Sequence, residues 1–241
     1  MKESNYIKFF LKIYSFICGE LPNYRFFHSR WLAYKDINTD LKRILPQLKG
    51  KILDVGCADK PYEKWLKDKK EYIGIDITAG PKVDFVISHL KPWPFQDDYF
   101  DSVICTQVLE HVDNLDKVLG EITRVLKPGG LCIVTVPFVY NEHSSPDDYR
   151  RFSLSGAKQI FDNKFEIIEA KKQGAFGSTT GLLFLNFLTL YKPTRFFFGI
   201  FLPVWILFCG IVNIFSFIID KFDTTAAFYL SVIVVAKKKN D

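Results

Sequence analysis

A polar, turn-rich segment over residues 137–152 holds the densest group of side chains that could do chemistry. His143 is the best candidate for a general base, because imidazole titrates near neutral pH and can take a proton from a hydroxyl. Side chains that could orient this imidazole, or bind a sugar or a phosphate, follow it: Asp147, Asp148, Tyr149, Arg150 and Arg151. Of these, we predict that Asp148, Tyr149 and Arg150 bind the substrate; the alternative is that the segment only closes over a bound ligand. The spacing of His143 and the carboxylates specifies no coordination geometry, so no metal site is predicted.

Seven short apolar segments have the length and composition of β-strands. They are Lys51–Val55, Tyr72–Asp76, Asp84–Ser88, Ser102–Thr106, Leu131–Pro137, Phe165–Lys171 and Phe228–Ala236. Helices are predicted between the first five strands, notably over Pro61–Lys69 and Asn114–Leu126. Strands that alternate with helices predict an α/β protein with a doubly wound, mostly parallel seven-stranded sheet. Ligands of such sheets bind outside the carboxyl ends of the strands, so a site is expected in the loops that follow them.

Five motifs of this strand-and-loop region follow one another in a recognisable order and spacing. They are Leu53-Asp-Val-Gly-Cys57, the acid Asp76, the pattern P-F-x-x-x-x-F-D from Pro94 to Asp101, Val108-Leu-Glu-His-Val112 and Leu126-Lys-Pro-Gly-Gly130. Together they resemble the motifs of the class I S-adenosylmethionine-dependent methyltransferases, specifically the type 11 methyltransferase domain family. The resemblance runs from about Gly50 to Pro137, and more loosely to the last strand. It implies a Rossmann-like methyltransferase fold, S-adenosylmethionine as cofactor, and an enzyme that transfers the cofactor's methyl group.

The resemblance also implies which residues bind the cofactor. Gly56 would let the backbone turn sharply beside the cofactor, and a helix after it would present its N–H groups to the methionine carboxylate. Asp76 would accept hydrogen bonds from the ribose hydroxyls, and Asp54 would face the cofactor's amino group or, alternatively, tie down the loop. The full predicted set is Asp54, Gly56, Cys57, Ala58, Asp76, Ile77, His89, Leu90 and Gln107.

Some positions depart from the family's pattern or leave a role open. The glycine-rich loop usually reads G-C-G-x-G, but Ala58 and Lys60 stand at the places of its second and third glycines. After the third strand the family commonly has an acid that contacts adenine, whereas here His89 or its neighbour occupies that place. Glu110 and His111 either lie in the site or orient the next helix.

Composition excludes some classes of protein and favours contact with a membrane. With 32 basic and 27 acidic residues, the chain is too mildly basic for a dedicated nucleic-acid binder. Five scattered cysteines without a C-x-x-C pair indicate a reduced, cytoplasmic protein. Basic residues exceed acidic ones by nine to four in residues 1–50 and by four to two in residues 221–241, which favours an anionic membrane surface.

Three apolar segments could meet lipid. Tyr6–Ile17 has the periodicity of an amphipathic helix, and its lysines interrupt the apolar run that a signal peptide needs. Gly181–Tyr191 and Phe196–Ile219 form an apolar insertion before the last strand. A single crossing would leave that strand on the wrong side of the bilayer, and two crossings need two spans of about 20 residues. We therefore predict a pair of helices that lies in one leaflet; the alternative is a buried cap or a homodimer interface.

These observations predict three parts of the chain: N-terminal helices over residues 1–49, a methyltransferase domain over residues 50–180 and 221–241, and the apolar insertion over residues 181–220. The predicted activity is methylation of oxygen on a lipid, a lipid-linked saccharide or another amphiphile, by a peripheral or monotopic protein on the cytoplasmic face of a membrane. One alternative is a soluble methyltransferase of small molecules or polysaccharides whose insertion is a dimer interface. Another is a noncatalytic membrane adaptor with the same fold.

Overall fold

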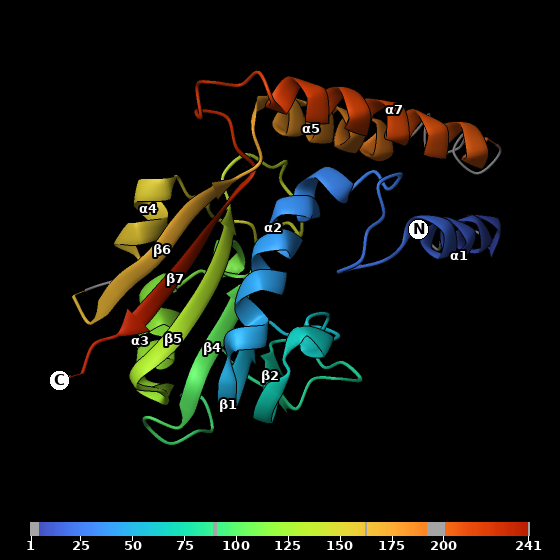
Figure 1. Cartoon of the computed structure of the whole chain (residues 1–241). Helices are drawn as coiled ribbons and strands as arrows, with labels where there is room; N and C mark the ends of the chain where they lie inside the picture. Colours follow the sequence, from blue (N-terminus) through green and yellow to red (C-terminus); the bar gives the residue numbers. More distant parts are fainter. Residues whose placement is uncertain (1–4, 89–90, 162, 192–200, 241) are drawn as a thin grey trace. The chain divides into compact units, whose positions relative to one another are not determined.

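The computed structural model describes residues 5–88, 91–161, 163–191 and 201–240, and the chain divides into two compact units (Figure 1). One unit joins residues 1–38 to residues 174–230, and the other joins residues 39–173 to residues 231–241. The N-terminal segment and the apolar insertion therefore belong to the same unit, although residues 39–173 of the other unit separate them in the sequence.

A seven-stranded sheet forms the centre of the second unit (Figure 1). Its strands are β1 (Lys49–Val55), β2 (Asp68–Asp76), β3 (Phe85–Val86), β4 (Phe100–Thr106), β5 (Leu126–Pro137), β6 (Phe165–Gln173) and β7 (Ser231–Lys238). Their spatial order is β3-β2-β1-β4-β5-β7-β6; the first five pair in parallel, and β7 is antiparallel to both neighbours. All seven predicted strands are confirmed. The strand order reverses between β1 and β4, which is where sheets of this kind bind their ligands.

The central strands are continuous apolar runs because both of their faces are covered. Four consecutive residues are buried at the end of β1, and six at the start of β7. A strand exposed on one face would alternate apolar and polar side chains instead. The sequence pattern of this chain thus already indicates a sheet enclosed between layers.

Two helices of the second unit begin at polar residues that cap them. The Asn114 side chain accepts a hydrogen bond from the backbone N–H of Lys117, and α3 (Leu115–Val125) packs against β5. Ser153 accepts in the same way from the N–H of Gly156, and α4 (Leu154–Gln159) packs against β6 and β7. The helix predicted over Asn114–Leu126 is confirmed.

The helix predicted over Pro61–Lys69 is wrong. Only a 3-10 turn, η2 (Glu63–Trp65), lies there, and β2 already begins at Asp68, where it pairs with the start of β1. Residues 56–67 are left for the whole connection, and its first part contains three residues with left-handed backbone that a right-handed helix does not accept.

In its described residues, the first unit has the helices α1 (Asn5–Cys18), the beginning of α2 (Trp31–Ile44), α5 (Phe176–Leu190) and α7 (Leu202–Asp220). A 3-10 turn, η1 (Leu45–Gln47), follows α2 in the other unit. The predicted N-terminal helix and the helical insertion are confirmed, except that residues 192–200 of the insertion lie outside the described residues.

α5 and α7 pack in antiparallel fashion and very closely. A Cβ added to Gly181 would lie 2.0 Å from the Ser216 Oγ, so only glycine lets the helices approach this far. At the start of α5, the N–H groups of Phe176 and Ser178 donate to the carboxylates of Asp223 and Asp220 at 2.9 and 2.8 Å. Negative charge stabilises this end of a helix.

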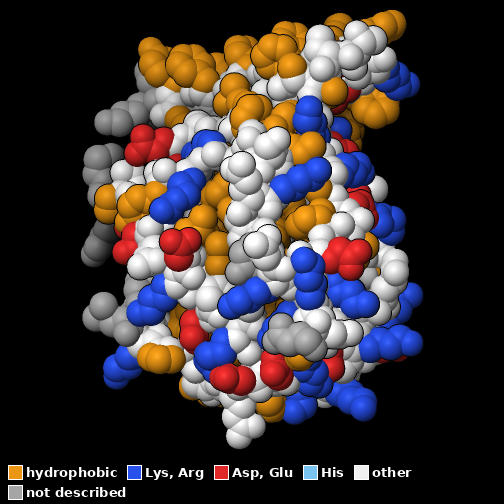
Figure 2. Space-filling model, turned by 90° about the vertical axis from the view of Figure 1, so that its left-hand side faces the viewer, with side chains coloured by type: hydrophobic (Ala, Val, Ile, Leu, Met, Phe, Trp, Pro, Cys, Tyr) orange, Lys and Arg blue, Asp and Glu red, His pale blue; other side chains and the backbone are white. Residues whose placement is uncertain are grey.

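The outer face of this helix pair is apolar. Exposed hydrophobic residues include Phe187, Val204, Leu207 and Phe215, each about 60% exposed. Figure 2 shows such side chains gathered along the edge that α5 and α7 form, at the top of the view. In the described part of the chain, α7 alone is long and apolar enough to cross a membrane, by length and composition.

Candidate functional site

A cavity of about 510 Å³ lies at the carboxyl ends of β1, β2 and β4, where the strand order reverses. Five of the nine predicted cofactor residues line it: Gly56, Ala58, Asp76, Ile77 and Gln107. Asp54 and Cys57 are buried and do not line it. His89 and Leu90 lie outside the described residues.

The loop after β1 keeps the path of a glycine-rich loop although two of its glycines are replaced. Gly56, Ala58 and Lys60 have φ angles of 69°, 42° and 50°, all in the left-handed region. Glycine adopts such angles without cost, whereas other residues pay roughly 1–2 kcal/mol. A Cβ on Gly56 would also lie 2.3 Å from a methyl carbon of Val108. All three positions that correspond to glycines of the G-C-G-x-G pattern therefore have a backbone conformation that favours glycine.

The helix expected to receive the methionine carboxylate is not present after this loop. Between β1 and β2, where every residue is described, η2 is the one helical turn. A binding site for that carboxylate on a helix N-terminus after β1 is therefore ruled out, because the short connection has no room for it.

Hydrogen bonds from two backbone N–H groups fix the carboxylate of Asp76 at the cavity wall. Ala58 donates to Oδ2 at 3.1 Å, and Thr78 donates to Oδ1 at 3.0 Å. Each carboxylate oxygen has a second lone pair, so both can still accept a hydroxyl of a ligand. Lys60 holds the loop from the other side, through an ion pair with Asp84.

Asp54 is buried beneath this loop, only 2% exposed, and accepts a hydrogen bond from the Tyr72 hydroxyl. Burial raises the pKa of Asp54 to about 7, against the opposing effects of the Tyr72 hydrogen bond and of the nearby Lys60 charge. Its contacts are those of a residue that ties β1 to β2.

The three predicted substrate residues hold the loop after β5 in place and do not line the cavity. The Asp148 carboxylate is 1% exposed and accepts two hydrogen bonds from Arg151, at 2.6 and 2.7 Å, which hold its pKa well below its usual range. Arg150 donates to the carbonyls of Val112 and Asp113, across the gap to the loop after β4. Tyr149, about half exposed, donates through its hydroxyl to an Asp147 carboxylate oxygen at 2.9 Å. From this loop, Ser144 and Asp147 reach the cavity instead.

His143, the predicted base, also lies behind the cavity wall, and His111 stands in front of it. His111 lines the cavity, and its Nε2 lies 3.2 Å from the Nε2 of His143. Glu110, the neighbour of His111, is completely buried, which raises its pKa to about 7. Of the two roles left open for these residues, the structure places His111 in the site.

Some cavity residues were missed by sequence reasoning. They are Trp93, which is 5% exposed, and residues at the start and on one side of α3: Asn114, Lys117 and Glu121. The capping residue Asn114 follows directly on the loop after β4, so its position next to the other loops was a usable signal. For Trp93 the sequence offered only its place between two prolines.

Residues 53–134 match the sequence profile of the type 11 methyltransferase domain. Among curated relatives, an uncharacterised protein of Methanocaldococcus jannaschii is 28% identical over 148 residues, which make up 55% of this chain and 65% of that protein. The sterol 4-C-methyltransferase of Caenorhabditis elegans is 47% identical over 79 residues, 33% of this chain and 23% of that protein. The chain thus spans less than two thirds of the length of these relatives.

Solved structures share the fold at low sequence identity. The [4+2]-cyclase SpnF has a TM-score of 0.57 and 19% identity over 88% of this chain and 83% of that chain. Phosphoethanolamine N-methyltransferase 2 of Haemonchus contortus, solved in complex with S-adenosylmethionine, has a TM-score of 0.53 and 15% identity over 99% of this chain and 61% of that chain. The predicted fold is confirmed: residues 53–134 match the type 11 methyltransferase domain, and the solved structures that share the fold include a methyltransferase in complex with S-adenosylmethionine.

Proposed function

We propose that this protein transfers the methyl group of S-adenosylmethionine to an oxygen of a lipid, a lipid-linked saccharide or another amphiphile at the cytoplasmic face of a membrane. The observation that carries the proposal is the cavity at the reversal of the strand order, with Gly56 and Asp76 on its wall. Its volume of about 510 Å³ suits a nucleoside-sized ligand with part of an acceptor.

Within the cavity, Asp76 would bind the ribose hydroxyls, and the loop at Gly56 would bring backbone close to the cofactor. Trp93 offers an aromatic face to adenine or to the sulfonium charge. Methyl transfer then requires that the protein hold acceptor, methyl and sulfur in line at about 3–3.5 Å. The methyl–sulfur bond breaks as the methyl–oxygen bond forms, and the sulfonium charge disappears.

An oxygen acceptor must lose its proton in this reaction. We assign its removal to the imidazole pair of His111 and His143, rather than to His143 alone, because His111 is the one that lines the cavity. Ser144 and Asp147, also on the wall, would contact the acceptor.

The membrane half of the proposal rests on the apolar face of α5 and α7. Gln173 ends β6 and Ser231 begins β7, on either side of the insertion, and they pair in the sheet, so the chain leaves and re-enters the second unit at adjacent positions. α5 has 15 residues and is too short for a bilayer core about 30 Å thick. A helix pair lying in one leaflet agrees with both observations. Exposed aromatic residues of α1, such as Phe9 and Phe16, add apolar surface to the same unit.

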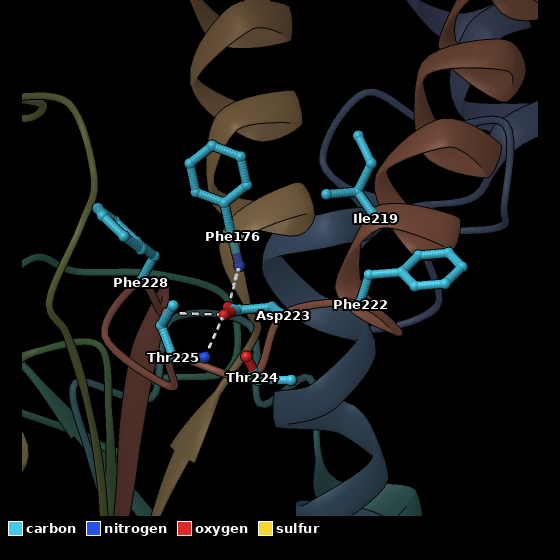
Figure 3. Close-up of a pocket in the computed structure, with 7 residues that line it drawn as sticks. All are labelled: Phe176, Ile219, Phe222, Asp223, Thr224, Thr225 and Phe228. Carbon is cyan, nitrogen blue, oxygen red and sulfur yellow. Dashed lines mark hydrogen bonds between the residues drawn. The ribbon is translucent and has the colours of Figure 1, made fainter.

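A second pocket, of about 330 Å³, adds apolar surface where the insertion ends. Figure 3 shows Phe176, Ile219, Phe222 and Phe228 around it, with Asp223 bound to the start of α5. An alkyl chain of a lipid would fit such a lining better than a polar ligand.

Calorimetric titration with S-adenosylmethionine tests the cofactor half. Wild-type protein should bind in the micromolar range, Asp76→Ala should abolish binding, and Asp59→Ala should not, because Asp59 is exposed in the same loop and does not line the cavity. Absence of binding by folded wild-type protein would refute the proposal and favour the noncatalytic adaptor. The test is needed because fold alone does not determine the reaction: the [4+2]-cyclase SpnF has the same fold.

Flotation with anionic vesicles tests the membrane half. The double variant Phe187→Asp and Phe215→Asp should stay at the bottom of the gradient, whereas Ile168→Asp, an equally apolar and exposed position in the sheet, should float with wild type. Full recovery of wild type as a soluble dimer without detergent would instead support the dimer interface.

Labelled S-adenosylmethionine, incubated with a lipid extract, identifies the atom that is methylated. A 13C-methyl signal in the ether region supports oxygen. A 13C-methyl signal in the aliphatic region would mean that the acceptor atom is carbon, which is the atom named for the sterol 4-C-methyltransferase of Caenorhabditis elegans.

A further inference from the structure

Three side chains at the wall of the cavity form a cluster whose chemistry the methyltransferase domain does not explain. Glu110 and His111 belong to the 3-10 turn η3 (Leu109–His111) after β4, and His143 lies in the loop after β5. One ligand atom from each lies within 4.8 Å of the others. β4 and β5 are parallel neighbours, so the fold itself brings these two loops together.

Hydrogen bonds on the far side of both rings determine which nitrogen carries the hydrogen. Nδ1 of His111 lies 2.5 Å from the carbonyl oxygen of Asp147, and Nδ1 of His143 lies 3.3 Å from that of Asn141 and from an Asp148 carboxylate oxygen. All of these oxygens are acceptors, so each Nδ1 is the donor. The two Nε2 atoms are then both lone-pair acceptors, 3.2 Å apart. Two lone pairs that face each other at this distance repel, unless a proton or a metal ion lies between them.

Glu110 supplies an independent observation. Its side chain is completely buried, and neither carboxylate oxygen has a hydrogen-bond partner on another described residue. A carboxylate oxygen lies 3.8 Å from the Nε2 of His111. A buried carboxylate without a partner is unfavourable, and a bound cation compensates for its desolvation.

We propose that Glu110, His111 and His143 bind a divalent transition metal ion of the zinc class. Metal–nitrogen bonds of about 2.0–2.1 Å that meet at a tetrahedral angle place two nitrogens about 3.3 Å apart, close to the spacing of the two Nε2 atoms. Two imidazoles and one carboxylate are a ligand set typical of catalytic zinc. Metal-bound histidines usually donate a hydrogen bond from their other ring nitrogen to a carbonyl or carboxylate oxygen, and the Nδ1 atoms of both histidines lie beside such oxygens.

Three protein ligands leave a fourth position for water or for an oxygen of the acceptor, and His111 places the ion beside the cavity. That role at the acceptor rests on the proposed function; the metal site itself does not. With the ion bound, both Nε2 atoms would be ligands and could not also act as bases. A hydroxyl bound to the ion would instead release its proton to water more readily, so the ion would replace the imidazole pair in the role assigned to it above.

Cobalt titration of untagged, chelator-treated full-length protein tests the site. Co²⁺ should bind one ion per chain with visible absorption bands, and Zn²⁺ should displace it. Glu110→Gln and His143→Gln should each weaken binding by more than about tenfold. Glu142→Gln, an exposed acid next to His143, should bind as wild type does.

Circular dichroism checks that each variant folds, and if Glu110→Gln does not, His143→Gln decides the question. Uptake of Co²⁺ that both ligand variants retain would overturn the proposal. So would a folded wild-type protein that takes up none, in which case a shared proton joins the two imidazoles. Asp76→Ala should lose S-adenosylmethionine and keep Co²⁺, so failure of the cofactor site and failure of the metal site are distinguishable.

Discussion

Asp54→Asn should make the protein more stable at neutral pH and leave it nearly unchanged in acid. Burial raises the pKa of Asp54 to about 7 from an ordinary value of 3.8. Between these two values the unfolded chain has released the proton that the folded chain still binds, so the stability that this group contributes falls as pH rises. At about 1.4 kcal/mol per pH unit, the loss approaches about 4 kcal/mol above pH 7. An asparagine has no proton to release and still offers an acceptor to the Tyr72 hydroxyl.

Urea unfolding at several pH values between 4 and 8, followed by tryptophan fluorescence, measures this difference. The free energy of unfolding of Asp54→Asn minus that of wild type should grow steadily from about pH 4 to about pH 7 and then level off. Asp59→Asn, an exposed acid in the same loop, should give a flat difference. A flat difference for Asp54→Asn as well would refute the reasoning, because it would mean that the carboxyl is ionised in the folded protein.

Three further predictions concern the same region. Gly56→Ala should cost at least about 1–2 kcal/mol of unfolding free energy and abolish S-adenosylmethionine binding in calorimetry, because its φ is left-handed and its Cβ would overlap Val108. Ala58→Gly should raise the unfolding free energy by up to about 1 kcal/mol, since it relieves a left-handed alanine; a loss of stability would show that the strain is absent. Arg151→Ala should cost about 3 kcal/mol in urea unfolding, because the Asp148 carboxylate, whose side chain is 1% exposed, loses both hydrogen bonds from Arg151 and keeps the one from the backbone N–H of His143; a cost below about 1 kcal/mol would mean that water reaches this carboxylate.

The strands and the position of the site could be predicted because both depend on local pattern. Short apolar runs followed by glycine or acid, as at Gly56 and Asp76, mark strand ends, and parallel strands bring their ends to one edge. The missing helix after β1 could not be predicted, because Pro61 and the charged residues after it suit a helix start. Instead, β2 already begins at Asp68, which pairs with the start of β1, so the connection before it is too short for the helix.

The roles of the side chains in the loop after β5 could not be predicted from the sequence, for a different reason. Arg150 and Asp148 have side chains that bind ligands as readily as they bind backbone. Which they do depends on the loop after β4, whose carbonyls take Arg150, and on the neighbouring Arg151, which takes Asp148. Such partners lie far away in the sequence or compete with other side chains of the same turn. The spacing of residues in the sequence does not show which partner is bound.

By itself, the sequence determined the match of residues 53–134 to the type 11 methyltransferase domain, the order of strands and helices along most of the chain, and the apolar character of the insertion. Motif order and hydrophobic periodicity are local properties. Tertiary structure alone decided that His111 rather than His143 lines the cavity, and that the buried Glu110 lies beside the two imidazoles. It also decided that the outer face of α7 stays apolar and exposed while its inner face packs on α5. These outcomes depend on which side chains the sheet and the helices bring together across long stretches of chain, and burial and facing lone pairs exist only after that packing has formed.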